Sequence, residues 1–172
     1  MEISLAEQSK SFISPVLPKY GPSEVVRGEG VYLYGLDGKR YLDFAAGIAV
    51  VNTGHCHPKV VAAVRKQAGE LMHACVHVSW YPGYVELLNR LSGLVPELGM
   101  GYLCNSGTEA VEAAMKLAKY VTHRPGIIAF HGAFHGRTLG AASVTGKASL
   151  KKHYEPLLPS IYHAPYPWCV RC

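Results

Sequence analysis

A polar triplet, Ser106-Gly107-Thr108, separates the apolar residues 101–104 from a run of strong helix formers. The first N–H groups of a helix have no partners within it, and glycine lets a ligand approach the backbone closely. The triplet is therefore a candidate anion site, with phosphate the usual occupant. The same residues also allow a purely structural interpretation, because Ser106 and Glu109 form a capping box in sequence. A carboxylate at Glu109 would repel phosphate unless it points away.

A second candidate cluster lies in "FHGAFHGRTLG", residues 130–140. Phe134 offers a ring that can stack on a flat heteroaromatic group. Arg137 offers a guanidinium that can hold a carboxylate through two parallel hydrogen bonds, which lysine cannot copy. With a phosphate at the triplet, these groups describe a phosphorylated pyridine cofactor acting on an amino acid. Taken singly, Phe134 reads as a core residue and Arg137 as a solvated charge.

Two strands and one helix must position these groups. Residues 101–104 and 127–130 are short apolar runs that predict buried strands, and residues 108–121 predict a helix between them. Such a βαβ unit implies a parallel sheet buried on both faces. Both polar segments then follow the carboxyl end of a strand, where sheets of this kind bind ligands.

Upstream of this unit the pattern predicts an arm, a hairpin and two helices. Residues 1–20 are polar and irregular, and residues 25–44 alternate around an Asp-Gly pair that is typical of a hairpin turn. A loop rich in Gly and His follows. Helical spacing of apolar residues then predicts one helix over 58–72 and another that begins at Pro82.

The composition indicates a globular chain and excludes several function classes. The 172 residues carry a net charge of +5, without a basic stripe interleaved with aromatics, so we expect no nucleic-acid partner. No apolar run approaches the roughly 18 residues of a membrane span, and the N-terminus lacks a secretory pattern. We therefore expect a cytoplasmic protein that does not contact a membrane.

Patterns for metal sites and for other phosphate loops are incomplete. The five Cys are irregularly spaced, and Cys169 with Cys172 forms a lone CxxC pair without a second pair. Histidines spaced by four lack the Glu of a zinc-protease motif. Residues 140–148 imitate a P-loop, but Ala148 stands where Ser or Thr would bind magnesium. We expect no metal site.

The longer motifs resemble those of the class III aminotransferases, pyridoxal 5′-phosphate (PLP) enzymes of fold type I. That family includes ornithine, acetylornithine and 4-aminobutyrate aminotransferases. The matching stretches, in family order, are residues 30–60, "CNSGTEAVEAAMKLAK" at 104–119 and "FHGAFHGRTLGA" at 130–141. "APYPWCVRC", residues 164–172, is similar to a loop of 4-aminobutyrate-type members. The resemblance covers about residues 20–172.

The resemblance implies a cofactor-binding set, namely Ser106, Gly107, Thr108, Phe134 and His135. The Ser-Gly-Thr triplet would hold the PLP phosphate, and Phe134 would stack on the pyridine ring. Arg137 would bind a substrate carboxylate and Ile48 would line the substrate pocket. Ornithine aminotransferases tend to carry Tyr at the latter position, so Ile48 favours acetylornithine or 4-aminobutyrate. Related aminomutases lack the arginine, so Arg137 favours transamination over isomerisation.

The resemblance also implies a fold class and a domain organisation. The fold would be α/β, a partial fold type I PLP-dependent transferase with a mainly parallel sheet. Residues 1–50 would be the arm and hairpin, which the family counts with its small domain. Residues 51–172 would be the first portion of the large PLP-binding domain, truncated.

Family chains are well over twice as long as this one, which bears on catalysis. The Schiff-base Lys and the Asp that pairs with the pyridine nitrogen are expected beyond Cys172, so no catalytic residue is expected within the chain. The full-length protein would be a homodimer that transfers an amino group from an amino or ω-amino acid to a 2-oxo acid. The alternative is a truncated, non-catalytic fragment or binding module.

Overall fold

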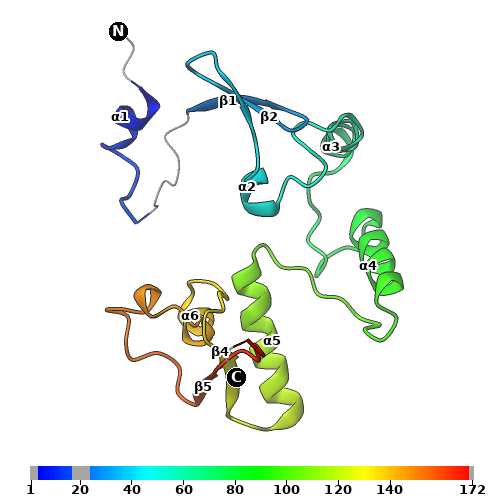
Figure 1. The fold of residues 1–172 in the computed structure, drawn as a ribbon. Coiled ribbons are helices and arrows are strands. Elements are labelled where there is room, and N and C mark those ends of the chain that lie inside the picture. Colours follow the sequence, from blue (N-terminus) through cyan, green and yellow to red (C-terminus); the bar gives the residue numbers. More distant parts are fainter. Residues whose placement is uncertain (1–3, 17–23, 171–172) are drawn as a thin grey trace. The chain divides into compact units, whose positions relative to one another are not determined.

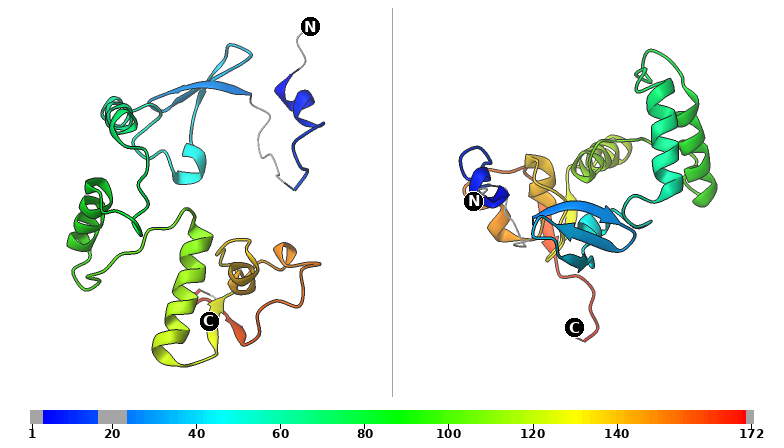
Figure 2. Two further views of the ribbon diagram at one scale, coloured as in Figure 1. Left: turned by 180° about the vertical axis from the view of Figure 1, so that it is seen from behind. Right: turned by 90° about the horizontal axis from the view of Figure 1, so that it is seen from above.

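The computed structural model describes residues 4–16 and 24–170, which form two compact units, Met1–Tyr81 and Pro82–Cys172 (Figures 1 and 2). Within the described residues, the first unit holds a three-stranded antiparallel sheet and the second a two-stranded parallel sheet. The predicted α/β class, with an antiparallel hairpin and a parallel sheet, is confirmed. The domain limits of 1–50 and 51–172 stay a prediction.

The sheet of the first unit consists of β1 (Val25–Glu29), β2 (Tyr32–Gly35) and β3 (Arg40–Leu42) in sequential order. The predicted hairpin is the β2–β3 pair. Its turn is stabilised by Asp37, which accepts hydrogen bonds from the Lys39 N–H (3.0 Å) and the Tyr41 hydroxyl (2.8 Å). The expected single hairpin is therefore a meander, because β1 adds a third strand.

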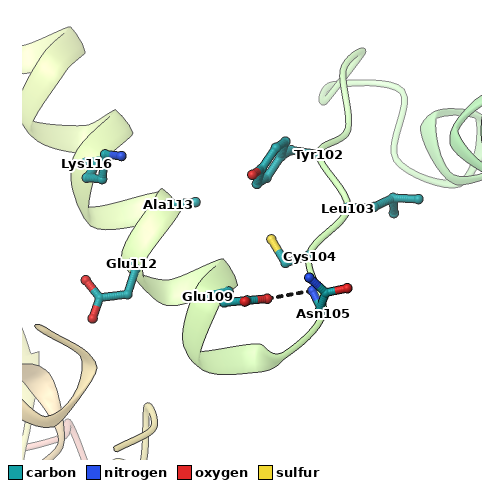
Figure 3. A pocket seen from close by; sticks show the side chains of 8 residues that line it. All are labelled: Tyr102, Leu103, Cys104, Asn105, Glu109, Glu112, Ala113 and Lys116. Atoms are coloured by element: carbon teal, nitrogen blue, oxygen red, sulfur yellow. Dashed lines mark hydrogen bonds between the residues drawn. The ribbon is translucent and has the colours of Figure 1, made fainter. Parts of the chain in front are cut away.

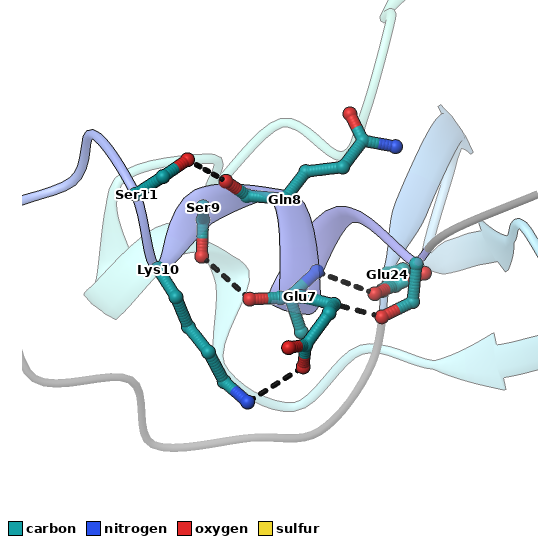
Figure 4. A network of polar contacts seen from close by, with 8 residues as sticks. Glu7, Gln8, Ser9, Lys10, Ser11 and Glu24 are labelled. Atoms are coloured by element: carbon teal, nitrogen blue, oxygen red, sulfur yellow. Dashed lines mark hydrogen bonds and ion pairs between the residues drawn. The ribbon is translucent and has the colours of Figure 1, made fainter.

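The predicted arm contains a short helix, α1 (Leu5–Ser9), so its irregular character is only partly correct. The Ser4 hydroxyl caps the helix by accepting from the Glu7 N–H (3.1 Å). The Glu24 carboxylate accepts from the Ala6 N–H (2.8 Å), which joins the start of α1 to the residue before β1 (Figure 4). Residues 1–3 and 17–20 of the arm lie outside the described residues.

The loop after β3 is organised around a carboxylate–histidine pair. The side chain of Asp43 is only 5% exposed, and its Oδ2 lies 2.6 Å from the Nε2 of His55. Its other oxygen accepts from the N–H groups of Ala45 (2.9 Å) and Ala46 (3.0 Å). These bonds fix both ends of the loop that carries α2 (Ala46–Ala49).

Loss of this pair gives a pH-dependent prediction. The hydrogen bond from His55, followed by those from the backbone, lowers the pKa of Asp43 below its ordinary 3.8. Between the lowered pKa and pH 3.8 the unfolded chain binds more protons at Asp43 than the folded chain does. The contribution of Asp43 to the free energy of unfolding is therefore complete above pH 3.8. It is lost as the pH falls through the pKa of the folded state. We expect Asp43→Asn to accelerate amide hydrogen exchange in the loop several-fold at neutral pH and to remove part of its acid sensitivity.

The control for this experiment is Glu70→Gln, since Glu70 is exposed and faces Lys66 at 3.9 Å. That variant should exchange like the parent chain. Equal exchange in the Asp43→Asn variant and the parent chain would show that the pair does not hold the loop.

Two helices begin at prolines, as the sequence predicts. α3 (Pro58–Glu70) lies in the first unit and α4 (Pro82–Leu94) in the second. The fixed φ of proline suits the first turn of a helix, where its missing N–H costs no hydrogen bond. Neither helix contains a buried residue.

The second unit contains α5 (Gly107–Thr122), the helix predicted over 108–121. β4 (Ile127–Phe130) follows, and it pairs in parallel with β5 (Ile161–Ala164). The connection between the two strands runs through α6 (Leu139–Val144) and the short 3-10 helix η1 (Ala148–Leu150).

Two expectations about this sheet are wrong. Residues 101–104 are not a strand, because no described residue pairs with them. The strand–helix–strand unit is therefore β4–α6–β5. The sheet is also not buried on both faces: Ala129 is 5% exposed and its neighbour Ile128 is 69% exposed. Apart from glycines, the buried residues in the described part of the chain are small and lie on β4 and on α6 with its C-cap, namely Ala129, Ala141, Ala142, Ser143, Val144 and Thr145.

None of the helices in the described part of the chain has the length and hydropathy of a membrane span.

Candidate functional site

The start of α5 presents free backbone donors beside open space. Ser106 is the N-cap in extended conformation, and its Oγ accepts from the Glu109 N–H (3.3 Å). The Ala110 N–H bonds to the Ser106 carbonyl (3.2 Å), so the N–H groups of Gly107 and Thr108 precede the intrahelical ladder. A Cβ built on Gly107 would meet nothing within 4 Å. These features fit the bound phosphate of a cofactor.

The acidic side chain beside this helix start is engaged elsewhere. Glu109 accepts from the Asn105 N–H at 2.6 Å, and Figure 3 shows its carboxylate directed at that residue. The predicted capping box is therefore half correct: Ser106 caps the helix, but Glu109 reaches the amide one residue before the cap. The Glu109 carboxylate is thus stabilised by a backbone donor and lies beside the pocket that residues 102–105 line.

The second candidate segment, residues 131–138, leaves the carboxyl end of β4 as predicted. The Phe134 ring is 60% exposed, and the Cζ of Arg137 lies 6.0 Å from its centroid. Both side chains are therefore available at the surface. The exposure of Phe134 disagrees with a core phenylalanine, whereas the exposed Arg137 remains compatible with a solvated charge as well as with a ligand contact.

The fully buried Thr145, at the end of α6, holds this segment in shape. Its hydroxyl oxygen accepts from the His135 N–H (3.1 Å) and bonds to the carbonyls of Gly136 (3.1 Å) and Ala141 (3.0 Å). The sequence analysis did not single out Thr145, since no motif marks a threonine whose partners are backbone groups four to ten residues away.

Hydrogen bonds also join the two candidate segments. The Thr108 and Thr138 hydroxyls lie 2.8 Å apart, and the Thr138 hydroxyl donates to Glu112 (2.6 Å). A Cβ on Gly136 would collide with the Thr108 hydroxyl. The structure therefore brings the helix start and the turn that carries Phe134 and Arg137 into direct contact. Thr138 and Glu112 are further residues that the sequence analysis missed.

Two pockets lie next to these segments. One of about 270 Å³ runs along α5 (Figure 3) and is lined by Tyr102, Leu103, Cys104, Asn105, Glu109, Glu112, Ala113 and Lys116. The other, of about 460 Å³, is lined by Phe130, His131, Gly132, Ala133, His135 and Tyr166. His135 thus borders a pocket, whereas Ser106, Gly107 and Thr108 line neither of the two.

Ile48 belongs to the first unit and lies in α2, where it is 84% exposed. Its φ of 63° is unusual for a β-branched residue, and Ala46, Gly47 and Ala49 also have positive φ values. α2 is thus a left-handed turn that nothing in the sequence analysis foresaw. The predicted contact of Ile48 with substrate stays a prediction.

Among the described residues, no group of three or more His, Cys, Asp or Glu side chains could hold a metal ion. Cys169 is exposed and unpaired by a disulfide, and its CxxC partner Cys172 lies outside the described residues.

Comparison with known proteins gives consistent results. The family described as "Aminotransferase class-III" matches residues 18–171. A probable 4-aminobutyrate aminotransferase of Bacillus subtilis is 42% identical over 94% of this chain and 38% of its own length. An acetylornithine aminotransferase of Methanopyrus kandleri is 44% identical over 84% of this chain and 37% of its own length. The chain therefore spans about two fifths of the curated relatives it matches.

The fold agrees with solved structures. A crystal structure of the omega transaminase from Pseudomonas jessenii in complex with PMP superposes with a TM-score of 0.84, at 26% identity, over 99% of this chain and 41% of that one. The family match covers most of the chain, and the curated relatives are well above 30% identical over most of it. This chain belongs to the class-III aminotransferases, a family of PLP-dependent enzymes.

Proposed function

We propose that this chain supplies the phosphate-binding and carboxylate-binding parts of an aminotransferase site that acts on an ω-amino acid. The observation that carries the proposal is the contact between Thr108 and Thr138. This contact brings the helix start, with its free amides, against the turn that carries the exposed Phe134–Arg137 pair.

The start of α5 would hold the phosphate of PLP. The N–H groups of Gly107 and Thr108 and the Ser106 hydroxyl are its donors, and the positive end of the helix dipole adds to them.

The turn after β4 would orient the ring and the substrate. Phe134 presents an exposed face on which a pyridine ring can stack, and His135 borders the adjacent pocket. Arg137 keeps its guanidinium exposed, so it can bind a substrate carboxylate through two hydrogen bonds. When bound, PLP supplies an electron-poor ring that weakens the bonds at the carbon bearing the amino group.

Two observations support an ω-amino donor. Two of the relatives, at 42% and 44% identity, are a probable 4-aminobutyrate aminotransferase and an acetylornithine aminotransferase. Ile48 stands where the resemblance places Tyr in ornithine aminotransferases. We further propose that the full-length protein works as a cytoplasmic homodimer with a 2-oxo acid acceptor.

The proposal is tested by the rates of the full-length, PLP-loaded protein on 4-aminobutyrate, acetylornithine and ornithine, with 2-oxoglutarate as acceptor. We expect one of the first two donors to react faster than ornithine. A preference for ornithine would overturn the interpretation of Ile48. No turnover with any donor would favour a non-catalytic binding module.

A further inference from the structure

One acidic side chain of α5 connects the two halves of the proposed site. Glu112 follows Thr108 by four residues, so both lie on the same face of the helix. Its Oε1 accepts from the Thr138 hydroxyl (2.6 Å) and from the Ala141 N–H (3.0 Å). A Cβ on Gly140 would collide with the Glu112 carboxylate, so the start of α6 packs closely against it.

Glu112 supplies the side-chain cap of α6 that Thr138 does not provide. Thr138 is the N-cap of α6, yet its side chain makes no capping bond. Its hydroxyl instead donates to Glu112, and Glu112 accepts the Ala141 N–H of the first turn. The carboxylate of α5 thus holds both the cap residue and the helix that follows the Arg137 turn.

The charge of Glu112 also orders the hydroxyl protons. A threonine hydroxyl has one proton, and that of Thr138 is donated to Glu112. In the 2.8 Å contact between Thr108 and Thr138, Thr108 is therefore the donor. Its proton is engaged within the protein. The Ser106 oxygen, in contrast, accepts from the Glu109 N–H and keeps its own proton free for a ligand.

We propose that Glu112 is a positioning residue for the PLP phosphate. Through Thr138 it directs the Thr108 hydroxyl away from the phosphate and holds the 134–138 turn against the start of α5. The phosphate is then held by the amides of Gly107 and Thr108 and by the Ser106 hydroxyl. This inference rests on the proposed function, because it assigns the donors of that same site.

The test compares the dissociation constants of PLP and of pyridoxal, which lacks the phosphate, for the full-length protein by fluorescence titration. Glu112→Gln is nearly isosteric and should weaken PLP binding about tenfold. Pyridoxal binding should stay unchanged. Thr138→Val should have the same effect as Glu112→Gln, and Thr138→Ser should restore parent-like binding.

The Thr108→Val variant distinguishes two arrangements. In one, a relay of hydrogen bonds runs from Thr108 through Thr138 to Glu112; in the other, the Thr108 hydroxyl contacts the phosphate directly. In the relay, Thr108→Val and Thr138→Val act on one chain of bonds, so the double variant should bind PLP as tightly as either single variant. If Thr108→Val weakens PLP binding while Glu112→Gln and Thr138→Val do not, Thr108 contacts the phosphate directly and the inference is wrong.

Two further comparisons distinguish a failure of this inference from a failure of the proposed function. Ser106→Ala is the control for the proposed function, since it removes the free side-chain donor. If neither Ser106→Ala nor any of the other variants changes the ratio of PLP to pyridoxal affinity, the phosphate does not bind at the start of α5. The proposed function then fails together with the inference. If Glu112→Gln does not fold, the Thr138→Val and Thr138→Ser pair decides the inference alone.

Discussion

Replacing Gly136 with alanine is expected to destabilise the second unit by about 2–5 kcal/mol and to abolish tight PLP binding. Gly136 has a φ of 125°, which side chains rarely adopt, and it is buried in the turn between Phe134 and Arg137. An added Cβ would also collide with the Thr108 hydroxyl at the start of α5. The free energy of unfolding from urea titration and the PLP dissociation constant measure both effects.

Gly132 provides the matched control. Its φ of 81° is also positive, but a Cβ there would meet nothing within 4 Å. Gly132→Ala should therefore show the backbone strain alone, about 1–2 kcal/mol. Equal losses of unfolding free energy in the two variants would mean that the turn at Gly136 does not pack against the start of α5.

Arg137→Lys is expected to lower kcat/KM for a carboxylate-bearing amino donor about 10- to 100-fold. Lysine keeps the charge but cannot form the bidentate pair of hydrogen bonds with the substrate carboxylate. Arg137→Ala should cost more. Steady-state kinetics of the full-length protein measure the loss, and PLP affinity should change little because Arg137 does not hold the phosphate in this proposal.

A donor without a carboxylate, 1-aminobutane, is the control for this prediction. Its rate should not fall in the Arg137→Lys variant. A loss of the same size for 1-aminobutane and 4-aminobutyrate would show that Arg137 supports the fold of the turn and does not recognise the carboxylate.

The sequence predicted the elements whose causes are local. Ser106 caps α5 and Asp37 closes the β2–β3 turn through hydrogen bonds to residues within four positions. Proline opens α3 and α4 because its fixed φ suits the first turn of a helix. The uncapped N–H groups at the start of α5 and the position of the Phe134–Arg137 turn after β4 also follow from residue type and spacing, while the binding roles of these residues stay predictions.

The features that sequence reasoning missed depend on partners far along the chain. Residues 101–104 have the composition of a strand, but a strand exists only where another one pairs with it. The Glu112–Thr138 bond joins residues 26 apart, and no periodicity reveals it. The left-handed turn at Ala46–Ala49 opposes the ordinary preference of alanine and isoleucine, so it could not be read from their types.

The most direct test of the account is a crystal structure of the full-length protein with PLP. The account predicts phosphate oxygens within about 2.7–3.2 Å of the Gly107 and Thr108 nitrogens and of the Ser106 hydroxyl, with Thr108 Oγ1 still bonded to Thr138. A phosphate bound away from the start of α5 would contradict it.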